Sequence, residues 1–324
     1  MAGSAVHEGA TMKCRLLNNG RLPPALLARL GEACTLTHLG DQADPAAHLA
    51  AHGADYEALV TSAAVGADAA LLARLPRLKV ISSFGVGLDK IDLAAARARG
   101  VAVGYTPDVL NDCVADTAWG LLIDVARGFS AADRFVRRGE WAQGPYRLGR
   151  KVSGARLGIV GMGRIGRAIV QRSTGFEMPV RYHTRTPVAG LPWPHEPSLI
   201  ELARWADFLV LITAGGAGTR HLVNAAVLDA LGPQGYLINV ARGSVVDEAA
   251  LVCALSEQRI AGAGLDVFEN EPHVPPALLA LDNVVLLPHV ASATVQTRQA
   301  MADRVFDNLQ SFMSQGRLLS AAPL

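Results

Sequence analysis

Short apolar runs rich in Val, Leu and Ile alternate with longer stretches of helical periodicity along this chain. Such alternation predicts parallel sheets built from strand–helix–strand units. In the first third of the chain, strands are predicted at residues 13–17, 58–61, 78–82 and 101–105. Helical stretches such as residues 69–75 and 93–99 separate them, and each is followed by Pro or Gly as a stop signal.

A second series of apolar runs begins after a long amphipathic stretch at residues 112–138. That stretch predicts one or two helices, with an interruption near Arg127 and Gly128. The strands predicted after it are residues 156–160, 180–184, 208–213, 236–240, 262–267 and 284–287. The final helix, at about residues 294–315, has no strand after it, and the Pro-dense residues 187–197 predict a surface loop.

Six parallel strands with a glycine turn after the first are typical of the doubly wound dinucleotide-binding arrangement. The predicted fold is therefore α/β, with two doubly wound parallel-sheet domains. A dinucleotide-binding domain at residues 107–292 is expected to be inserted in a smaller substrate-binding domain made of residues 1–106 and 293–324. A length of 324 residues suits two such domains.

The amino-acid composition indicates which kinds of binding partner the protein is expected to have. Half of the residues are hydrophobic, and 30 basic residues stand against 29 acidic ones, for a formal net charge of +1. This balance indicates no nucleic-acid or anionic membrane partner, so an anionic ligand must be bound by a few placed groups. Residues 1–12 lack the features of a signal peptide, and the longest apolar runs have only strand length. A cytoplasmic protein without a membrane span is expected.

The four cysteines are far apart in the sequence and show no spacing typical of a metal site. They are Cys14, Cys34, Cys113 and Cys253. The pattern predicts reduced, mostly buried thiols rather than a zinc site or a disulfide framework. No metal is expected.

A GxGxxG motif follows one predicted strand and opens the next predicted helix. Its members are Gly161, Gly163 and Gly166, with Arg164 and Ile165 before the last glycine. The first glycine permits a tight turn, the second lets the backbone approach a pyrophosphate, and the third lets helix and strand pack closely. The pattern alone has little specificity, but after a strand and before a helix it predicts a dinucleotide-binding turn rather than a purely structural one.

The end of the second strand in this series decides between the two nicotinamide cofactors. It reads His183, Thr184, Arg185 and Thr186. A carboxylate there would bind the ribose hydroxyls and repel a 2′-phosphate, but this chain has no acid between Glu177 and Glu196. Arg185 supplies a forked cation, so the segment favours NADP(H) over NAD(H). The alternative is a solvated basic loop.

Three polar residues follow three late strands, at the edge where ligands bind in open α/β sheets. They are Arg242, Glu271 and His289. Their chemistry suits reduction of a 2-keto acid. His289 would donate a proton to the carbonyl oxygen, and Glu271 would orient the ring and favour its protonated form. Arg242 would pair with the substrate carboxylate and polarise the carbonyl.

Other residues at the ends of strands are expected to line the cofactor. They are Thr213, Val240, Ala241 and Asp266. Asp266 has two further interpretations, as a group that supports the catalytic residues and as a turn-forming carboxylate.

The segments GMGRIG, NVARGSVVDEAAL, GAGLDVFENEP and NVVLLPHVASAT resemble the signature segments of the D-isomer-specific 2-hydroxyacid dehydrogenases, over almost the whole chain. The resemblance implies a Rossmann domain inserted in a flavodoxin-like substrate domain. It implies Arg242, Glu271 and His289 as the catalytic set, with His289 as the acid/base. It also implies that backbone N–H groups of Val86 and Gly87, in the glycine loop SFGVGLD, meet the substrate carboxylate.

Within the family, SSFGVGLDKIDL, TPDVLNDCVADTAWGLL and the basic TRT are most similar to glyoxylate/hydroxypyruvate reductases and hydroxyphenylpyruvate reductases. Their substrates are small 2-keto acids, and a homodimer is the family expectation, with residues 112–138 at the contact. Trp141 matches a tryptophan that in some relatives reaches the neighbouring active site; a buried interface tryptophan is the alternative. Residues 213–219 depart from the family, because TAGGAGT replaces a proline-rich loop.

The sequence is consistent with three functions. The first is an NADPH-dependent reductase of glyoxylate, hydroxypyruvate or a bulkier 2-keto acid. The second is an enzyme of the same family with another substrate, such as 2-ketogluconate or 3-phosphoglycerate. The third is a dinucleotide-sensing transcriptional corepressor, which has a similar fold and a similar Arg/Glu/His set.

Overall fold

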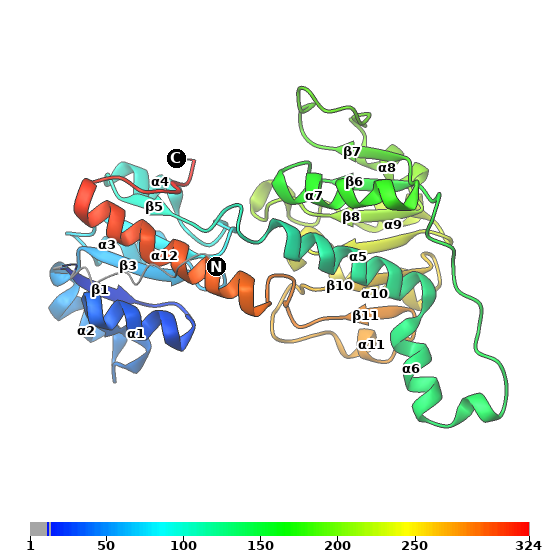
Figure 1. The fold of residues 1–324 in the computed structure, drawn as a ribbon, viewed down its shortest axis with the longest axis horizontal. Coiled ribbons are helices and arrows are strands. Elements are labelled where there is room, and N and C mark those ends of the chain that lie inside the picture. Colours follow the sequence, from blue (N-terminus) through cyan, green and yellow to red (C-terminus); the bar gives the residue numbers. More distant parts are fainter. Residues whose placement is uncertain (1–11, 13, 324) are drawn as a thin grey trace, which may run out of the picture. The chain divides into compact units, whose positions relative to one another are not determined.

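The computed structural model describes residue 12 and residues 14–323, and these residues form two compact units (Figure 1). Unit 1 contains the described residues up to Leu110 together with those from Thr294 onward, and unit 2 is Asn111–Ala293. Lys13, where the sequence predicts the first strand to begin, and the N-terminal residues 1–11 lie outside the described residues.

Unit 1 has a five-stranded, all-parallel sheet in the order β2-β1-β3-β4-β5. The strands are β1 (Arg15–Asn18), β2 (Thr35–His38), β3 (Ala58–Ser62), β4 (Val80–Phe84) and β5 (Ala102–Gly104). The helices are α1 (Pro24–Ala33), α2 (Pro45–His52), α3 (Ala69–Ala73), α4 (Leu93–Ala98) and α12 (Val295–Gln315). This strand order is the flavodoxin-like form of the doubly wound sheet. β3 and β4 are completely buried, as expected for central strands covered on both faces.

The strand β2 was not predicted from the sequence, which gave four strands for this part of the chain. Its sequence, TLTH, has one aliphatic residue, and none of its four residues is buried. β2 forms the edge of the sheet and pairs with β1 alone. An edge strand needs less apolar character than a central one, and so it leaves a weak signal in the sequence.

The last helix, α12, returns the chain to the sheet of unit 1. The Ser82 hydroxyl in β4 donates to the Val305 carbonyl of α12 at 3.1 Å. The Asn308 amide donates to the Tyr105 carbonyl at 3.1 Å, and its oxygen accepts from the Ser320 N–H at 3.0 Å. Both side chains, Ser82 and Asn308, are buried and bonded, so α12 covers this sheet despite the long sequence separation.

Unit 2 has a six-stranded, all-parallel sheet in the order β11-β10-β9-β8-β6-β7. The strands are β6 (Leu157–Val160), β7 (Val180–His183), β8 (Phe208–Leu211), β9 (Tyr236–Asn239), β10 (Gly262–Leu265) and β11 (Val284–Leu286). All six lie within the ranges predicted from the sequence. The chain reverses direction across the sheet between β6 and β8, and such a switch point is where open α/β sheets bind ligands.

The helices of unit 2 are α5 (Asn111–Arg127), α6 (Phe129–Arg137), α7 (Arg164–Ser173), α8 (Leu199–Trp205), α9 (Ala225–Leu231), α10 (Glu248–Ser256) and α11 (Pro276–Leu279). The predicted interruption of the long amphipathic stretch is confirmed at Gly128, which has φ 67° between α5 and α6. No helix among the described residues combines the length and apolar character that crossing a membrane requires.

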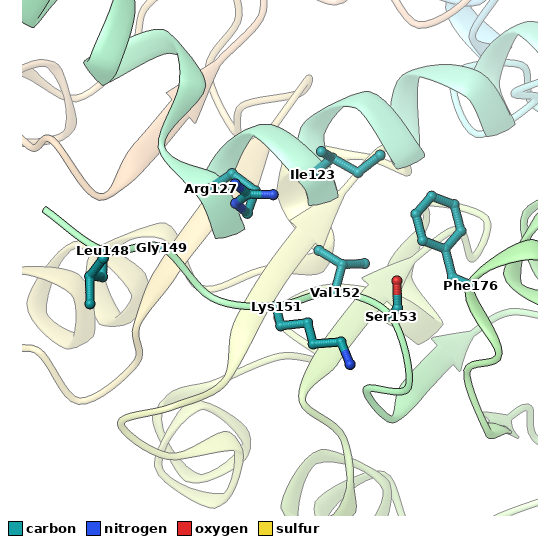
Figure 2. Close-up of a pocket in the computed structure, with 8 residues that line it drawn as sticks. All are labelled: Ile123, Arg127, Leu148, Gly149, Lys151, Val152, Ser153 and Phe176. Carbon is teal, nitrogen blue, oxygen red and sulfur yellow. The ribbon is translucent and has the colours of Figure 1, made fainter. Parts of the chain in front are cut away.

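α6 and the segment after it project from the body of unit 2, and the chain then returns as a strap past the C-terminal end of α5 (Figure 1). A pocket of about 370 Å³ lies beside this strap. Figure 2 shows its lining residues, among them Ile123 and Arg127 on α5 and Lys151 and Val152 on the strap. Gly149 allows the close contact, because a Cβ there would lie 2.9 Å from the Cα of Arg127. The strap therefore packs tightly against the C-terminal end of α5.

Asp207, just before β8, anchors the strap to the sheet. Its carboxylate accepts bonds from the Arg156 N–H at 2.8 Å and from the Arg150 guanidinium at 2.9 Å, and its side chain is 14% exposed. Burial opposes ionisation, but the hydrogen bonds and charge of Arg156 and the charge of Arg150 outweigh it, so the pKa of Asp207 lies below its usual range.

We expect Asp207→Asn to lower the free energy of unfolding near neutral pH by about 2 kcal/mol, because charge-assisted hydrogen bonds are lost. The folded pKa is lower than the unfolded one, so the carboxylate stabilises the fold fully above about pH 4 and loses this effect as pH falls further. Urea unfolding of both proteins across this pH range measures the difference. If the difference in free energy of unfolding between the two proteins stayed constant as the pH falls, ionisation of Asp207 would not be its source.

Candidate active site

The turn between β6 and α7 carries the three glycines of the GxGxxG motif, and two of them are required by contacts within the protein. Gly161 has φ 103°, and a Cβ there would lie 2.8 Å from the Ile212 backbone. A Cβ on Gly166 would lie 2.3 Å from the Gly161 carbonyl oxygen. A Cβ on Gly163 would meet nothing within 4 Å, so this side of the turn is open. The open glycine precedes the ten-residue helix α7, whose first N–H groups suit a diphosphate.

The end of β7 is closed by the loop of residues 187–197. His183 Nδ1 lies 2.9 Å from the Glu196 carbonyl, and His195 Nε2 lies 2.9 Å from the Thr184 carbonyl. Carbonyl oxygens only accept, so these two ring nitrogens are the donors. Arg185, at the tip, is exposed. The Thr184 hydroxyl donates to the Thr186 carbonyl at 2.7 Å, so the predicted hydroxyl donor is engaged within its own loop.

His289 and Glu271 form a close pair of titratable groups at the ends of the strands. His289 Nδ1 lies 2.7 Å from Glu271 Oε2, and Glu271 Oε1 accepts from the Phe268 N–H at 3.1 Å. A carboxylate acceptor fixes the proton on Nδ1, so Nε2 is the ring nitrogen left for a substrate. The side chains are 44% and 34% exposed, so the pair is accessible.

Asp266 holds the backbone on which His289 sits. Its carboxylate accepts from the N–H groups of Val290 at 2.7 Å and Ala291 at 2.9 Å, and its carbonyl accepts from the His289 N–H at 2.9 Å. His289 has φ 55°, an uncommon conformation for a residue other than glycine, and these bonds support it. Burial raises the pKa of Asp266 despite the two N–H donors. Both donors of these side-chain bonds lie after β11, so the Asp266 carboxylate ties that segment to the end of β10.

Arg242 follows β9 and belongs to the same electrostatic environment. Its guanidinium donates to the Ala241 carbonyl at 2.7 Å, and the Asn239 amide donates to the Arg242 carbonyl at 3.0 Å. Burial raises the pKa of Glu271, but the bond and charge of His289, the Phe268 N–H and the charge of Arg242 together hold that pKa below its usual range. The lowered pKa indicates that Glu271 is an ionised carboxylate beside His289 and Arg242.

The remaining residues expected to line the cofactor also follow strands of unit 2. Val240 and Ala241 come directly after β9 and are buried, and Thr213 comes shortly after β8 and is half-buried. In the loop after Thr213, the Thr219 hydroxyl donates to the Ala214 carbonyl at 2.7 Å. The loop that departs from the family pattern is thus closed by its own hydrogen bonds.

The glycine loop of unit 1 follows β4. Gly85 has φ 145°, and a Cβ there would lie 2.5 Å from the Ala63 Cβ, so glycine is required. Its N–H donates to the Thr106 hydroxyl at 3.1 Å, which fixes the turn. In the described part of the chain, the next two N–H groups, of Val86 and Gly87, meet no acceptor. They are available to an anionic ligand.

A second His–Glu contact was missed by the sequence analysis. Glu269 accepts from Arg220 at 2.7 Å and lies 3.0 Å from His221 Nε2. Its N–H donates to Glu248 at 3.1 Å. These bonds tie the loop after β8 to the turn that carries Glu271. The two acids of the segment FENEP were visible in the sequence, but their different partners depend on the packing of the loop after β8.

Comparison with known proteins identifies the family. Residues 119–291, within unit 2, match the family model described as "D-isomer specific 2-hydroxyacid dehydrogenase, NAD binding domain". A glyoxylate/hydroxypyruvate reductase of Arabidopsis thaliana and a hydroxyphenylpyruvate reductase of Plectranthus scutellarioides are each 48% identical over 272 residues, or 84% of this chain and 87% of theirs.

A solved structure supports the same assignment. The NADPH-dependent glyoxylate/hydroxypyruvate reductase of Sinorhizobium meliloti, in complex with NADP and malonate, superposes with a TM-score of 0.90. It is 46% identical, and the match covers 96% of this chain and 97% of that one. The chain belongs to the D-isomer-specific 2-hydroxyacid dehydrogenases, an enzyme family of dinucleotide-dependent oxidoreductases. The predicted family and the predicted pair of doubly wound parallel sheets are both confirmed.

Proposed function

We propose that this protein is an NADP-dependent D-2-hydroxyacid dehydrogenase that works mainly as a reductase of small 2-keto acids such as glyoxylate or hydroxypyruvate. The observation that carries the proposal is the His289–Glu271 pair at 2.7 Å, with Arg242 close enough to lower the pKa of Glu271. An imidazole, a carboxylate and a guanidinium together supply a proton donor, its orienting partner and an anion clamp.

NADP(H) fits unit 2 on two observations: Gly163 is open before α7, and no carboxylate follows β7 before Glu196. The residues proposed to hold it are Gly161, Gly163, Arg164, Ile165, Gly166, His183, Thr184, Arg185, Thr186, Thr213, Val240, Ala241 and Asp266. When bound, NADPH supplies the hydride for reduction of the keto carbon. The Sinorhizobium meliloti reductase, solved in complex with NADP, supports this assignment.

The protein's own side chains bind the keto acid and move the proton. Arg242 pairs with the substrate carboxylate and polarises the carbonyl. The N–H groups of Val86 and Gly87 are proposed to donate hydrogen bonds to a substrate carboxylate. His289 donates a proton from Nε2 to the carbonyl oxygen as it becomes a hydroxyl. Glu271 keeps the ring oriented and compensates its positive charge.

The substrate assignment is tested by NADPH oxidation with glyoxylate, hydroxypyruvate, phenylpyruvate and 2-ketogluconate, each repeated with NADH. We expect the highest kcat/KM with NADPH and one of the two smallest acids. A preference for phenylpyruvate would instead favour a hydroxyphenylpyruvate reductase, the activity of a relative that is equally similar in sequence. NADPH binding without turnover of any acid would favour a dinucleotide-sensing role.

Arg185→Asp should reverse the cofactor preference, because it replaces a phosphate-binding cation with a carboxylate that repels the 2′-phosphate. The substitution removes one or two charge-assisted hydrogen bonds to the 2′-phosphate. This loss should lower the ratio of kcat/KM for NADPH to kcat/KM for NADH by about 10- to 100-fold. The same charge change in α8, Arg204→Asp, is the matched control and should leave the ratio unaltered. An unchanged ratio in Arg185→Asp would remove Arg185 from the cofactor site.

A homodimer is part of the proposal. The projecting segment after α5 exposes four large apolar side chains: Phe129, Val136, Trp141 and Leu148. Trp141 is 68% exposed and Leu148 is 96% exposed, which suits a surface covered by a second copy. Light scattering on the purified protein should give twice the mass of the chain. The cytoplasm stays the compartment expected from the sequence.

A further inference from the structure

Two of the four cysteines lie side by side in unit 1. Cys14 precedes β1 and Cys34 precedes β2, and their sulfur atoms lie 3.0 Å apart in a hydrogen bond. The strands pair in parallel with Arg15 opposite Thr35, so the residues before them face each other as well. The Thr35 N–H donates to the Cys14 carbonyl at 3.0 Å, which continues the strand pairing to this point.

This pairing corrects part of the sequence-based expectation. Cys14 and Cys34 are buried, but Cys113 is only half-buried and Cys253 is exposed. The expectation of mostly buried thiols therefore holds for two of the four cysteines. The prediction that the cysteines form no site rested on their distance from one another in the sequence. The sheet nevertheless brings two cysteines that are 20 residues apart into contact. Among the described residues, no group of three His, Cys, Asp or Glu side chains has the geometry for a metal.

A pocket gives small molecules access to the pair. It has a volume of about 590 Å³, and both cysteines line it together with Met12, Arg15 and Glu57. When Cys14 ionises, it accepts the hydrogen bond of the Cys34 thiol, which lowers the pKa of Cys14 against the effects of burial and of the nearby Glu57. The same contact and burial raise the pKa of Cys34. The pair thus has one favoured nucleophile and one neighbouring thiol.

We propose that Cys14 and Cys34 are a modification site at which a peroxide forms an intramolecular disulfide. The Cys14 thiolate attacks a peroxide oxygen, the O–O bond breaks, and a sulfenic acid forms with release of hydroxide, which takes up a proton to become water. Cys34 then attacks the Cys14 sulfur, the S–O bond breaks, and a second water leaves. Two thiols are oxidised by two electrons, and one hydrogen peroxide is reduced to two waters.

The geometry needed for the bond is close to that in the reduced protein. The sulfurs must approach from 3.0 Å to about 2.05 Å, and their backbones already face each other across one strand spacing, which lies within the range of disulfides. The bond would tie the end of α1 to the start of β1, around a loop that contains the whole helix. A crosslink of this kind stabilises the fold by restricting the unfolded chain.

The experiment uses the full chain with Cys113→Ser and Cys253→Ser, which leaves only the proposed pair. The protein is exposed to hydrogen peroxide, alkylated under denaturing conditions, digested without reductant and studied by mass spectrometry. We expect a crosslinked Cys14–Cys34 peptide, lost on reduction, and a midpoint of thermal unfolding that rises by several degrees on oxidation. Free thiols at both positions after peroxide, or only sulfinic acids there, would overturn the proposal.

A second variant separates the two steps. Cys34→Ser in the same background removes the thiol that closes the bond, so peroxide should give a sulfenic acid at Cys14 that a dimedone-type reagent traps. A trapped sulfenic acid at Cys34 in the converse variant, Cys14→Ser, at the same rate would contradict the assignment of Cys14 as the attacking thiol. Steady-state reduction of the keto acid by reduced Cys34→Ser should equal that of the parent, because Cys34 takes no part in the proposed reaction.

Discussion

His289→Ala is expected to lower kcat for 2-keto acid reduction by roughly 10²–10⁴, because the group that donates a proton to the carbonyl oxygen is removed. The dissociation constant for NADPH should change little, since the proposed cofactor contacts of unit 2 are left in place. Steady-state kinetics and fluorescence titration with NADPH measure the two quantities separately. The expected effect is the largest of those considered because no other imidazole is paired with Glu271 in the described part of the chain.

His273→Ala is the matched control for this experiment. His273 is an exposed histidine on the same turn as Glu271, and its backbone N–H donates to the Asn270 carbonyl at 2.8 Å. Its removal takes away an imidazole near the site without touching the His289–Glu271 pair, and the rate should stay at the level of the parent. If His289→Ala retained the parental rate, histidine would have no part in the proton transfer.

Arg242→Ala is expected to raise KM for the keto acid and lower kcat together, with a loss of kcat/KM on the order of 10²–10³. The guanidinium is proposed to bind the substrate carboxylate and to act on the carbonyl, so its loss affects both binding and the transition state. Steady-state kinetics at saturating NADPH measures both parameters.

Arg242→Lys tests the geometry of that clamp. It keeps the positive charge beside Glu271 but removes the two-pronged donor, so its kcat/KM should fall between those of the parent and Arg242→Ala. A loss confined to the affinity for NADPH, with the keto-acid KM and kcat unchanged, would contradict the role as a substrate clamp.

Local steric rules explain why parts of the fold were predictable. Gly161 and Gly166 of the phosphate turn could be assigned from the sequence because the turn itself requires them: Gly161 has φ 103°, and a Cβ on Gly166 would meet the Gly161 carbonyl oxygen. Gly128 was likewise visible as an interruption, since only a residue that tolerates φ 67° ends α5 and starts α6 at once. Unit 2, whose strands are apolar and regularly spaced, was therefore predicted strand by strand.

The features that were missed depend on contacts between distant segments. Strand β2 is recognisable only when β1 lies beside it. The Cys14–Cys34 contact follows from the same register, and the bonds of Glu269 require the packing of the loop after β8 against the turn after β10. For the site, the sequence predicted which residue types end the strands. It could not predict that Asp266 holds the N–H groups after His289, because that depends on how β10 and β11 pair.

The proposed reaction delivers a hydride from NADPH and a proton from His289 to the carbonyl group of a small 2-keto acid, with the stereochemistry of a D-specific family. Chiral chromatography of the glycerate formed from hydroxypyruvate and NADPH tests it most directly. We predict D-glycerate in an amount equal to the NADPH consumed. L-glycerate, or consumption of NADPH with no glycerate formed, would contradict the account.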